Sequence, residues 1–149
     1  MIKIICVGKI KEDFFKEAVN EYQKRISKYA KIEIIEIPDE PIKEKAKAVE
    51  GLKILNKINS NDYVITLEIE GKQLDSVEFS KAINNWKINH SNIIFVIGGS
   101  YGLGDEIKQR SNYKLSFSKM TFPHQLFRII LLEKIYRSHK IISGETYHK

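Results

Sequence analysis

A glycine-rich loop is the first part of this sequence with residue types that could do chemistry. Four glycines fall within residues 98–104, directly after the apolar run Ile93 to Ile97. Glycine lacks a Cβ, so such a loop allows positive φ and a close approach of the backbone to a ligand. The chain has no G-x-x-x-x-G-K-[ST] motif, and Gly8 stands alone after the first apolar run, where a G-x-G-x-x-G motif would be expected. A nucleoside triphosphatase or an ordinary dinucleotide enzyme is therefore disfavoured.

The second candidate is the segment LSFSKMTFPHQ, which leads from a short strand-like run into a helix. Ser118, Thr121 and free backbone amides could bind polar groups. Phe117, Met120 and Phe122 could enclose an adenine. The same residues would also serve helix capping and core packing, and the residue chemistry alone favours that simpler interpretation.

The histidines and the single cysteine do not form a metal-binding pattern. His90, His124, His139 and His148 are scattered, and Cys6 lies alone within an apolar run. Zinc sites need several such ligands at short spacings, so we expect no metal. His139 is expected to be an exposed helix residue rather than a ligand. The chain contains no G-x-S-x-G elbow, and a lone cysteine excludes a disulfide within the chain, which suits a reducing compartment.

Length and composition predict one domain with a basic surface. The chain has 149 residues, of which 42% are hydrophobic, enough for a single domain over residues 1–149. No stretch has the layout of a signal peptide or the length of a membrane span, so we expect a cytoplasmic protein with no membrane partner. The net charge of +6 suits a polyanionic partner such as RNA. Positive charge gathers from residue 134 onward, where Glu145 is the one acid against Lys134, Arg137, Lys140 and Lys149.

Strand-like and helix-like segments alternate along the whole chain. Apolar or alternating runs predict strands at Ile2–Val7, Lys31–Ile37, Tyr63–Ile69, Ile93–Ile97 and Tyr113–Phe117. Helical spacing predicts helices at Glu12–Ser27, Lys43–Asn59, after an N-cap at Ser76, near Asp105–Gln109, and from Pro123 to about Ile142. This alternation predicts an α/β fold with a mostly parallel sheet between helix layers. Ligands bind at the carboxyl ends of such strands, so we expect a site at the loops after Ile69, Ile97 and Phe117.

The last predicted helix is apolar on nearly every side. Its apolar residues are Leu126, Ile129, Ile130, Leu131, Leu132 and Ile135. A helix that is apolar all round must be buried all round, whereas an outer helix of a small domain usually exposes one face. We therefore expect burial against a second copy of the chain in a homodimer. The alternative is a central helix within one monomer.

Motifs that follow one another along the entire chain together resemble the RlmH family. They are IKIICVGK from Ile2, TLEIEGK from Thr66, VIGGSYGL from Val96, LSFSKMTFPH from Leu115, the pair Tyr136-Arg137, and the terminal Tyr147-His148-Lys149. That family comprises ribosomal large-subunit pseudouridine N3-methyltransferases of the SPOUT superfamily. Tyr101 is a bulky residue at a position where the loop of the family varies.

The resemblance implies a fold and an activity that the residues alone do not give. It implies a SPOUT-like trefoil knot on the C-terminal side and a homodimer. It also implies methylation of N3 of a pseudouridine in 23S rRNA, on assembled ribosomes, with S-adenosylmethionine as methyl donor and no metal. Carried over by position, the cofactor-binding residues would be Leu67, Gly98, Phe117, Ser118, Lys119, Met120, Thr121 and Phe122.

The same resemblance places the C-terminal tail at the substrate. Arg137, Tyr147, His148 and Lys149 would meet the RNA, and the first three would assist catalysis. N3 of pseudouridine is an imide nitrogen, which attacks poorly until its proton is removed or its developing negative charge is stabilised. His148 is therefore a candidate proton acceptor and Arg137 a candidate for stabilising the anion. Tyr147 could stack on an unpaired base.

Two other functions fit the same motifs. One is a knotted methyltransferase that acts on another rRNA position or on transfer RNA, since the cofactor residues would serve both. The other is a non-catalytic RNA-binding protein that assists ribosome assembly. Cofactor binding measured by calorimetry distinguishes the non-catalytic protein from the two enzymes.

Overall fold

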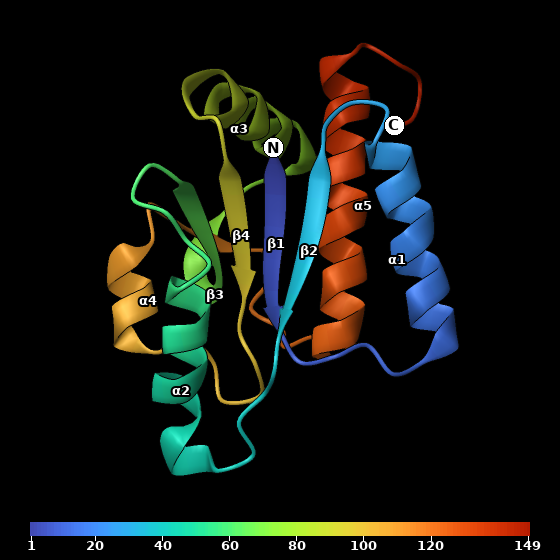
Figure 1. The fold of residues 1–149 in the computed structure, drawn as a ribbon. Helices are drawn as coiled ribbons and strands as arrows, with labels where there is room; N and C mark the ends of the chain where they lie inside the picture. The colour runs from blue at the N-terminus through green and yellow to red at the C-terminus, as the bar shows by residue number, and fades with distance from the viewer.

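All five strands of the computed structural model, which describes residues 1–149, lie in one parallel sheet (Figure 1). The strands are β1 (Ile2–Val7), β2 (Ile32–Ile37), β3 (Tyr63–Gln73), β4 (Ile93–Ile97) and β5 (Tyr113–Ser116). They are ordered β2-β1-β4-β3-β5, and every neighbouring pair is parallel. The predicted α/β class with a parallel sheet is therefore confirmed.

Five helices cover the two faces of the sheet and give it two apolar cores. One face packs against α1 (Asp13–Ile26), α3 (Ser76–Asn89) and α5 (His124–Ile142), and the other against α2 (Lys43–Leu55) and α4 (Asp105–Arg110). Alternate residues of the central strands enter the two cores, because side chains of a strand point to opposite faces. All of β4 is buried, as its unbroken apolar run predicts. None of the helices combines the length and the apolar character needed to cross a membrane.

Strand β3 is longer than the sequence predicts. It does not end at Ile69 but continues to Gln73, with a shift of register against β5 between Leu67 and Lys72. Gly71 makes this possible, because a Cβ there would lie only 2.8 Å from the backbone of Leu115. The glycine thus allows the two strands to stay in contact where a larger residue would separate them.

Two predicted helix ends are also wrong. The N-cap of α3 is Asp75 rather than Ser76, because the Asp75 carboxylate accepts from the Glu78 amide at 2.7 Å while Glu78 accepts from the Asp75 amide at 2.9 Å. Helix α2 ends at Leu55 rather than Asn59. The chain after Leu55 turns instead to meet the buried Asp62, whose carboxylate accepts from the Asn59 amide at 2.8 Å.

Helix α5 packs between α1 and α3, so most of its apolar surface is covered within the chain. Leu131, Leu132 and Ile135 are fully buried. Burial of the inner side chains of α5 therefore does not require the second subunit that the sequence led us to expect. Leu126 and Ile142, at its two ends, remain 37% and 39% exposed.

His139 on α5 is buried, which corrects the expectation of an exposed residue. It is 2% exposed and stacks on Tyr29 with ring centroids 5.8 Å apart. Its Nδ1 donates to the carbonyl oxygen of Ile135 at 2.8 Å, so its Nε2 accepts from Lys87 at 2.9 Å. Burial, reinforced by the positive charge of Lys87, lowers the pKa of His139. The imidazole therefore serves as a neutral core residue.

Candidate functional site

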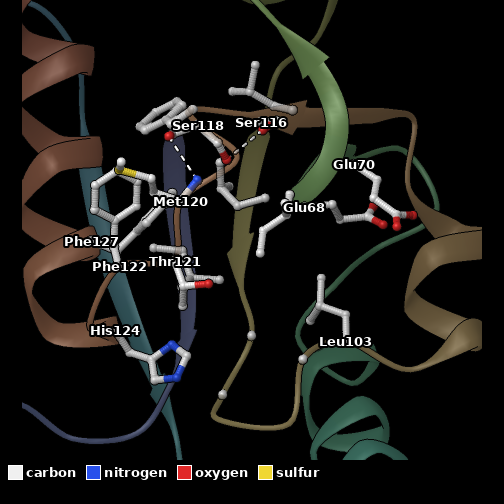
Figure 2. A pocket seen from close by; sticks show the side chains of 18 of the residues that line it. Glu68, Glu70, Leu103, Ser116, Ser118, Met120, Thr121, Phe122, His124 and Phe127 are labelled. Carbon is white, nitrogen blue, oxygen red and sulfur yellow. Dashed lines mark hydrogen bonds between the residues drawn. The ribbon is translucent and has the colours of Figure 1, made fainter.

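A cavity of about 560 Å³ opens at the carboxyl ends of β3, β4 and β5 (Figure 2). Its walls are residues 67–70 of β3, residues 97–103 after β4, and most of residues 115–122 after β5, together with Lys108, His124 and Phe127. The chain after β5 passes behind β4 in the view of Figure 1 on its way to α5, which brings this segment against the other two. The three loops that the sequence marks as a site are thus brought together.

The glycine loop forms one wall of this cavity with its backbone. A Cβ on Gly98 would lie 3.0 Å from Leu103 Cδ2, and a Cβ on Gly99 would lie 2.9 Å from Val7 Cγ1. Gly102 has a φ of 80°, a conformation that glycine adopts without strain, and its amide donates to the carbonyl of Gly99 at 3.0 Å. A side chain is therefore excluded at Gly98 and Gly99, and there a ligand in the cavity can contact the main chain.

The segment after β5 forms the opposite wall and is folded by its own serines. Ser116 Oγ donates to the carbonyl of Ser118 at 3.1 Å, and Ser118 Oγ accepts from the amide of Met120 at 3.0 Å (Figure 2). Thr121 also lines the cavity, whereas Lys119 is not among its lining residues. Met120 is 76% exposed at the rim. Both serines therefore stabilise the fold of this loop through their hydroxyl groups, and both also line the cavity.

Three aromatic rings give this wall its apolar part. Phe117 stacks on Phe127 with ring centroids 5.2 Å apart, and Phe122 meets Phe127 edge to face at 5.3 Å. Leu67 and Leu115 line the cavity beside them. The rings of Phe117 and Phe122 thus pack on Phe127 and also line the cavity, so that enclosure of an adenine stays a prediction. The sequence analysis did not include Phe127, which lies one helical turn after Pro123.

Two carboxylates on β3 are site residues that the sequence analysis missed. Glu68 and Glu70 line the cavity and lie on the same side of the strand (Figure 2). Glu68 Oε2 accepts from the hydroxyl of Thr66 at 2.6 Å, while Glu70 has no hydrogen-bond partner within the chain. The signal that could have found them is the alternation of acidic and apolar residues at the carboxyl end of β3.

A buried charged group lies on α5 next to the cavity residue Phe127. Arg128 is 1% exposed, and its guanidinium donates to Glu36 Oε2 at 2.7 Å and to the carbonyl of Gly8 at 3.1 Å. His124, one turn earlier on α5, lines the cavity. Burial lowers the pKa of His124, Arg128 lowers it further, and the carboxylate of Glu50 opposes this effect. His124 is therefore held as a neutral imidazole at the cavity.

The C-terminal tail lies away from the cavity, docked on α5. Arg137, Tyr147, His148 and Lys149 are absent from its lining. Ten positions separate the cavity residue Phe127 from Arg137 on the helix, which corresponds to about 15 Å at 1.5 Å per residue. Tyr147 packs against Tyr136 with ring centroids 4.9 Å apart and donates to Glu133 Oε1 at 3.1 Å. Within one chain, the predicted cofactor residues and the predicted substrate residues therefore form two separate groups.

Arg137 and His148 also contact each other in this docked tail. Nη1 of Arg137 lies 3.0 Å from Nδ1 of His148. A guanidinium can only donate, so Nδ1 of His148 is the acceptor and its proton is on Nε2. The lone pair that a neutral imidazole would use to accept a proton is therefore already engaged.

The basic excess near the C-terminus is partly neutralised. Lys134 and Arg137 both pair with Glu133, at 3.0 Å and 2.7 Å, and Lys140 pairs with Glu145 at 2.7 Å. The free positive charge of this region is smaller than the sequence suggests. No group of three or more histidine, cysteine, aspartate or glutamate side chains is arranged to hold a metal ion.

Comparisons with known proteins match the chain over its whole length. A family model described as "Predicted SPOUT methyltransferase" matches residues 1–148. A protein of Methanococcus vannielii is 56% identical over 99% of both chains. Proteins of Enterococcus faecalis and Clostridium botulinum, each named "Ribosomal RNA large subunit methyltransferase H", are 52% and 53% identical, again over 99% of both chains.

A solved structure shares the fold at much lower sequence similarity. It is described as a probable methylase family protein from Haemophilus influenzae, and it superposes with a TM-score of 0.62 at 12% identity. The match covers 99% of this chain and 70% of that one.

Proposed function

Because the chain belongs to the SPOUT methyltransferase family, we propose that it transfers a methyl group from S-adenosylmethionine to a base of large-subunit ribosomal RNA. One observation carries this proposal: relatives that share more than half of their residues with the chain, over 99% of both lengths, are named for this reaction. We assign the target as N3 of a pseudouridine in 23S rRNA, modified on assembled ribosomes in the cytoplasm.

The cavity suits S-adenosylmethionine in shape and chemistry. Gly98 and Gly99 leave a wall of main chain that any Cβ would disturb, which suits a ligand held by backbone contacts. Phe117, Phe122 and Leu67 would enclose the adenine. The polar remainder of residues 117–122, including Lys119 through its main chain, would contact the rest of the cofactor. When bound, this group supplies a methyl carbon already activated by a sulfonium, so that the protein must chiefly position the acceptor.

We infer a homodimer in which the tail of one chain meets the cavity of the other. Arg137, Tyr147, His148 and Lys149 would hold the RNA, yet within a chain they lie outside the cavity, and Arg137 lies about 15 Å along α5 from the cavity residue Phe127. A second copy resolves this separation if it brings its own tail to the first cavity. The exposed apolar side chains of Leu126 and Ile142 mark α5 as part of the interface. The trefoil knot belongs to this proposal as well, with residues 117–123 as its crossing segment.

In that arrangement the tail would prepare the base for reaction. Tyr147 would stack on it, and Arg137 would stabilise the negative charge that develops when N3 loses its proton. His148 would assist by holding the base. To take the proton itself, it must first leave Arg137, which now occupies its Nδ1.

Mass spectrometry of ribosomal RNA tests the proposed reaction. RNA from a strain that lacks this protein should lack one methyl group on one pseudouridine of 23S rRNA. Adding the purified protein and S-adenosylmethionine to ribosomes from that strain should restore the methyl group. Restoration at a different nucleotide, or in transfer RNA, would identify a different target for the same fold.

A further inference from the structure

Glu68 begins a short chain of hydroxyl groups that leads from the cavity wall into the protein. Its Oε2 lies 2.6 Å from Thr66 Oγ1, which lies 2.7 Å from Ser111 Oγ. Ser111 Oγ in turn lies 2.9 Å from the carbonyl oxygen of Tyr113. Thr66 is completely buried, whereas Glu68 lines the cavity. The chain therefore runs from a cavity carboxylate through a buried hydroxyl to the half-buried Ser111 and Tyr113.

This chain has three oxygen–oxygen contacts but lacks one proton when Glu68 is ionised. A carboxylate and a carbonyl only accept, so the protons must come from the hydroxyls of Thr66 and Ser111. If Thr66 donates to Glu68 and Ser111 donates to Tyr113, no proton remains for the 2.7 Å contact between the two hydroxyls. An ionised Glu68 thus leaves one contact without a hydrogen bond.

A proton on Glu68 completes the chain. Glu68 then donates to Thr66, Thr66 donates to Ser111, and Ser111 donates to Tyr113. All three contacts become hydrogen bonds without movement of any heavy atom. The contact between Thr66 and Ser111, which has no proton when Glu68 is ionised, is then also a hydrogen bond. Glu70 lines the same cavity but has no such chain, so a proton there gains nothing comparable.

We propose that Glu68 accepts the proton that the target base loses during methyl transfer, which rests on the function proposed above. The N3–H bond breaks, and its electron pair forms the new bond from N3 to the methyl carbon. The electron pair of the former sulfur–methyl bond stays on sulfur. The proton forms an O–H bond on the carboxylate of Glu68, which then donates to Thr66. Atoms and charge balance without a further reactant.

The other titratable groups around Glu68 do not offer the same combination. They are Glu70 on β3, Tyr101 in the glycine loop, Lys108 on α4 and His124 at the start of α5. A fifth is Lys114 on β5, which is the register partner of Thr66 on β3. Lysine ammonium groups cannot accept a proton, and the His124 ring makes no hydrogen bond within the chain that an added proton would complete, unlike Glu68. His148 lies outside the cavity with its lone pair engaged by Arg137. Glu68 therefore lies in the cavity with an oxygen that can accept a proton, and beside Thr66, to which the protonated carboxyl can donate a hydrogen bond.

Single-turnover methylation as a function of pH tests this role. The substrate is ribosomes from a strain without this protein, with saturating S-adenosylmethionine. The parent rate should fall toward acidic pH as the acceptor becomes protonated. Glu68→Gln should lower the rate by about 10²–10⁴-fold, the usual contribution of a general base, and should abolish this acidic decline. The matched variant Glu70→Gln should lose far less and should keep the decline.

The stability and cofactor affinity of Glu68→Gln show whether this variant is folded. The introduced amide can donate to Thr66 as the protonated carboxyl does, so all three contacts are hydrogen bonds in this variant. The thermal midpoint should therefore be no lower than that of the parent, and the calorimetric affinity for S-adenosylmethionine should equal that of the parent. Transfer by Glu68→Gln at the parent rate would overturn the proposal, and so would a slow variant that keeps the acidic decline. A parent protein that methylates no ribosomal RNA would instead overturn the proposed function, and the role of Glu68 with it.

Discussion

Arg137 donates to Nδ1 of His148 over 3.0 Å, which fastens the C-terminal tail to helix α5. The same guanidinium donates to Glu133 at 2.7 Å and lies 4.7 Å from the ring centroid of Tyr147. Arg137 thus contacts both tail residues that the proposed mechanism needs. In the free chain this cluster holds the tail away from its own cavity, and RNA bound as proposed would have to compete with Glu133 for the guanidinium.

Deletion of Tyr147 to Lys149 should separate binding from catalysis. The truncated protein should fold and bind S-adenosylmethionine with near-parent affinity, because the cavity contains none of these residues. Stability should fall by about 1 kcal/mol, since the hydrogen bond from Tyr147 to Glu133 is lost. Single-turnover methylation should fall by orders of magnitude. Parent-rate transfer would show that the tail has no role at the substrate, and weaker cofactor binding would place it in the cofactor pocket.

Gly98→Val should prevent cofactor binding. Its Cβ would meet Leu103 at 3.0 Å and the backbone of Gly102 at 3.2 Å, and its methyl groups would project further into the wall. Calorimetry with S-adenosylmethionine should detect no binding. Gly51→Ala is the matched control, because its Cβ meets Ile107 at an ordinary 3.7 Å within α2. That variant should bind normally and gain about 1 kcal/mol of stability from better helix propensity. Normal binding by Gly98→Val would mean that the pocket is wrongly assigned.

Leu126→Asp should weaken the proposed dimer. Sedimentation of the parent at micromolar concentration should give about twice the chain mass of 17.3 kDa. A charge in the interface would need to be desolvated, so the variant should shift toward monomer. Leu52→Asp provides the comparison, since Leu52 is 58% exposed on α2, across the sheet from α5. A monomeric parent with full activity would exclude the dimer, and an equal effect of both variants would exclude this interface.

Acidic pH should destabilise the fold through His139. Burial lowers the pKa of this imidazole below its ordinary value of about 6.5, so the unfolded chain binds the proton more readily. Stability is therefore complete above pH 6.5 and is lost as pH falls from there toward the folded-state pKa. Urea unfolding at pH 7.5 and 5.5 should show this loss, at up to about 1.4 kcal/mol per pH unit. His139→Gln should flatten the dependence, leaving the contribution of His124 in the same direction; an unchanged slope would contradict the assignment.

The sequence predicts the fold better than it predicts the site. Unbroken apolar runs such as Ile93–Ile97 identify strands because burial on both faces requires them. The end of β3 is not predictable in this way, since it depends on how closely Gly71 approaches a strand more than 40 residues later. His139 is misplaced for a related reason: its burial depends on Tyr29 and Lys87, which local periodicity does not reveal.

The residues that form the site are likewise only partly predictable from the sequence. The loops at residues 98–104 and 117–122 can be identified from the sequence, the first by its glycine content and both by their resemblance to the family. Glu68 does not, because an acidic residue at the end of a strand is ordinary until Thr66 and Ser111 are seen beside it. The position of the tail is also invisible in the sequence, since Tyr147 docks on a helix face that only the folded chain presents.

Arg128 connects parts of the protein that are synthesised far apart in time. Its guanidinium reaches Glu36 across 92 residues and Gly8 across 120 residues. Contacts of such long sequence separation form late, because the intervening chain must first be brought together. A nascent chain that still lacks α5 has neither this buried cation nor Phe127, on which Phe117 and Phe122 of the cavity wall pack. We therefore expect that the growing polypeptide has no binding site for the cofactor, and that the site first exists once α5 has left the exit tunnel.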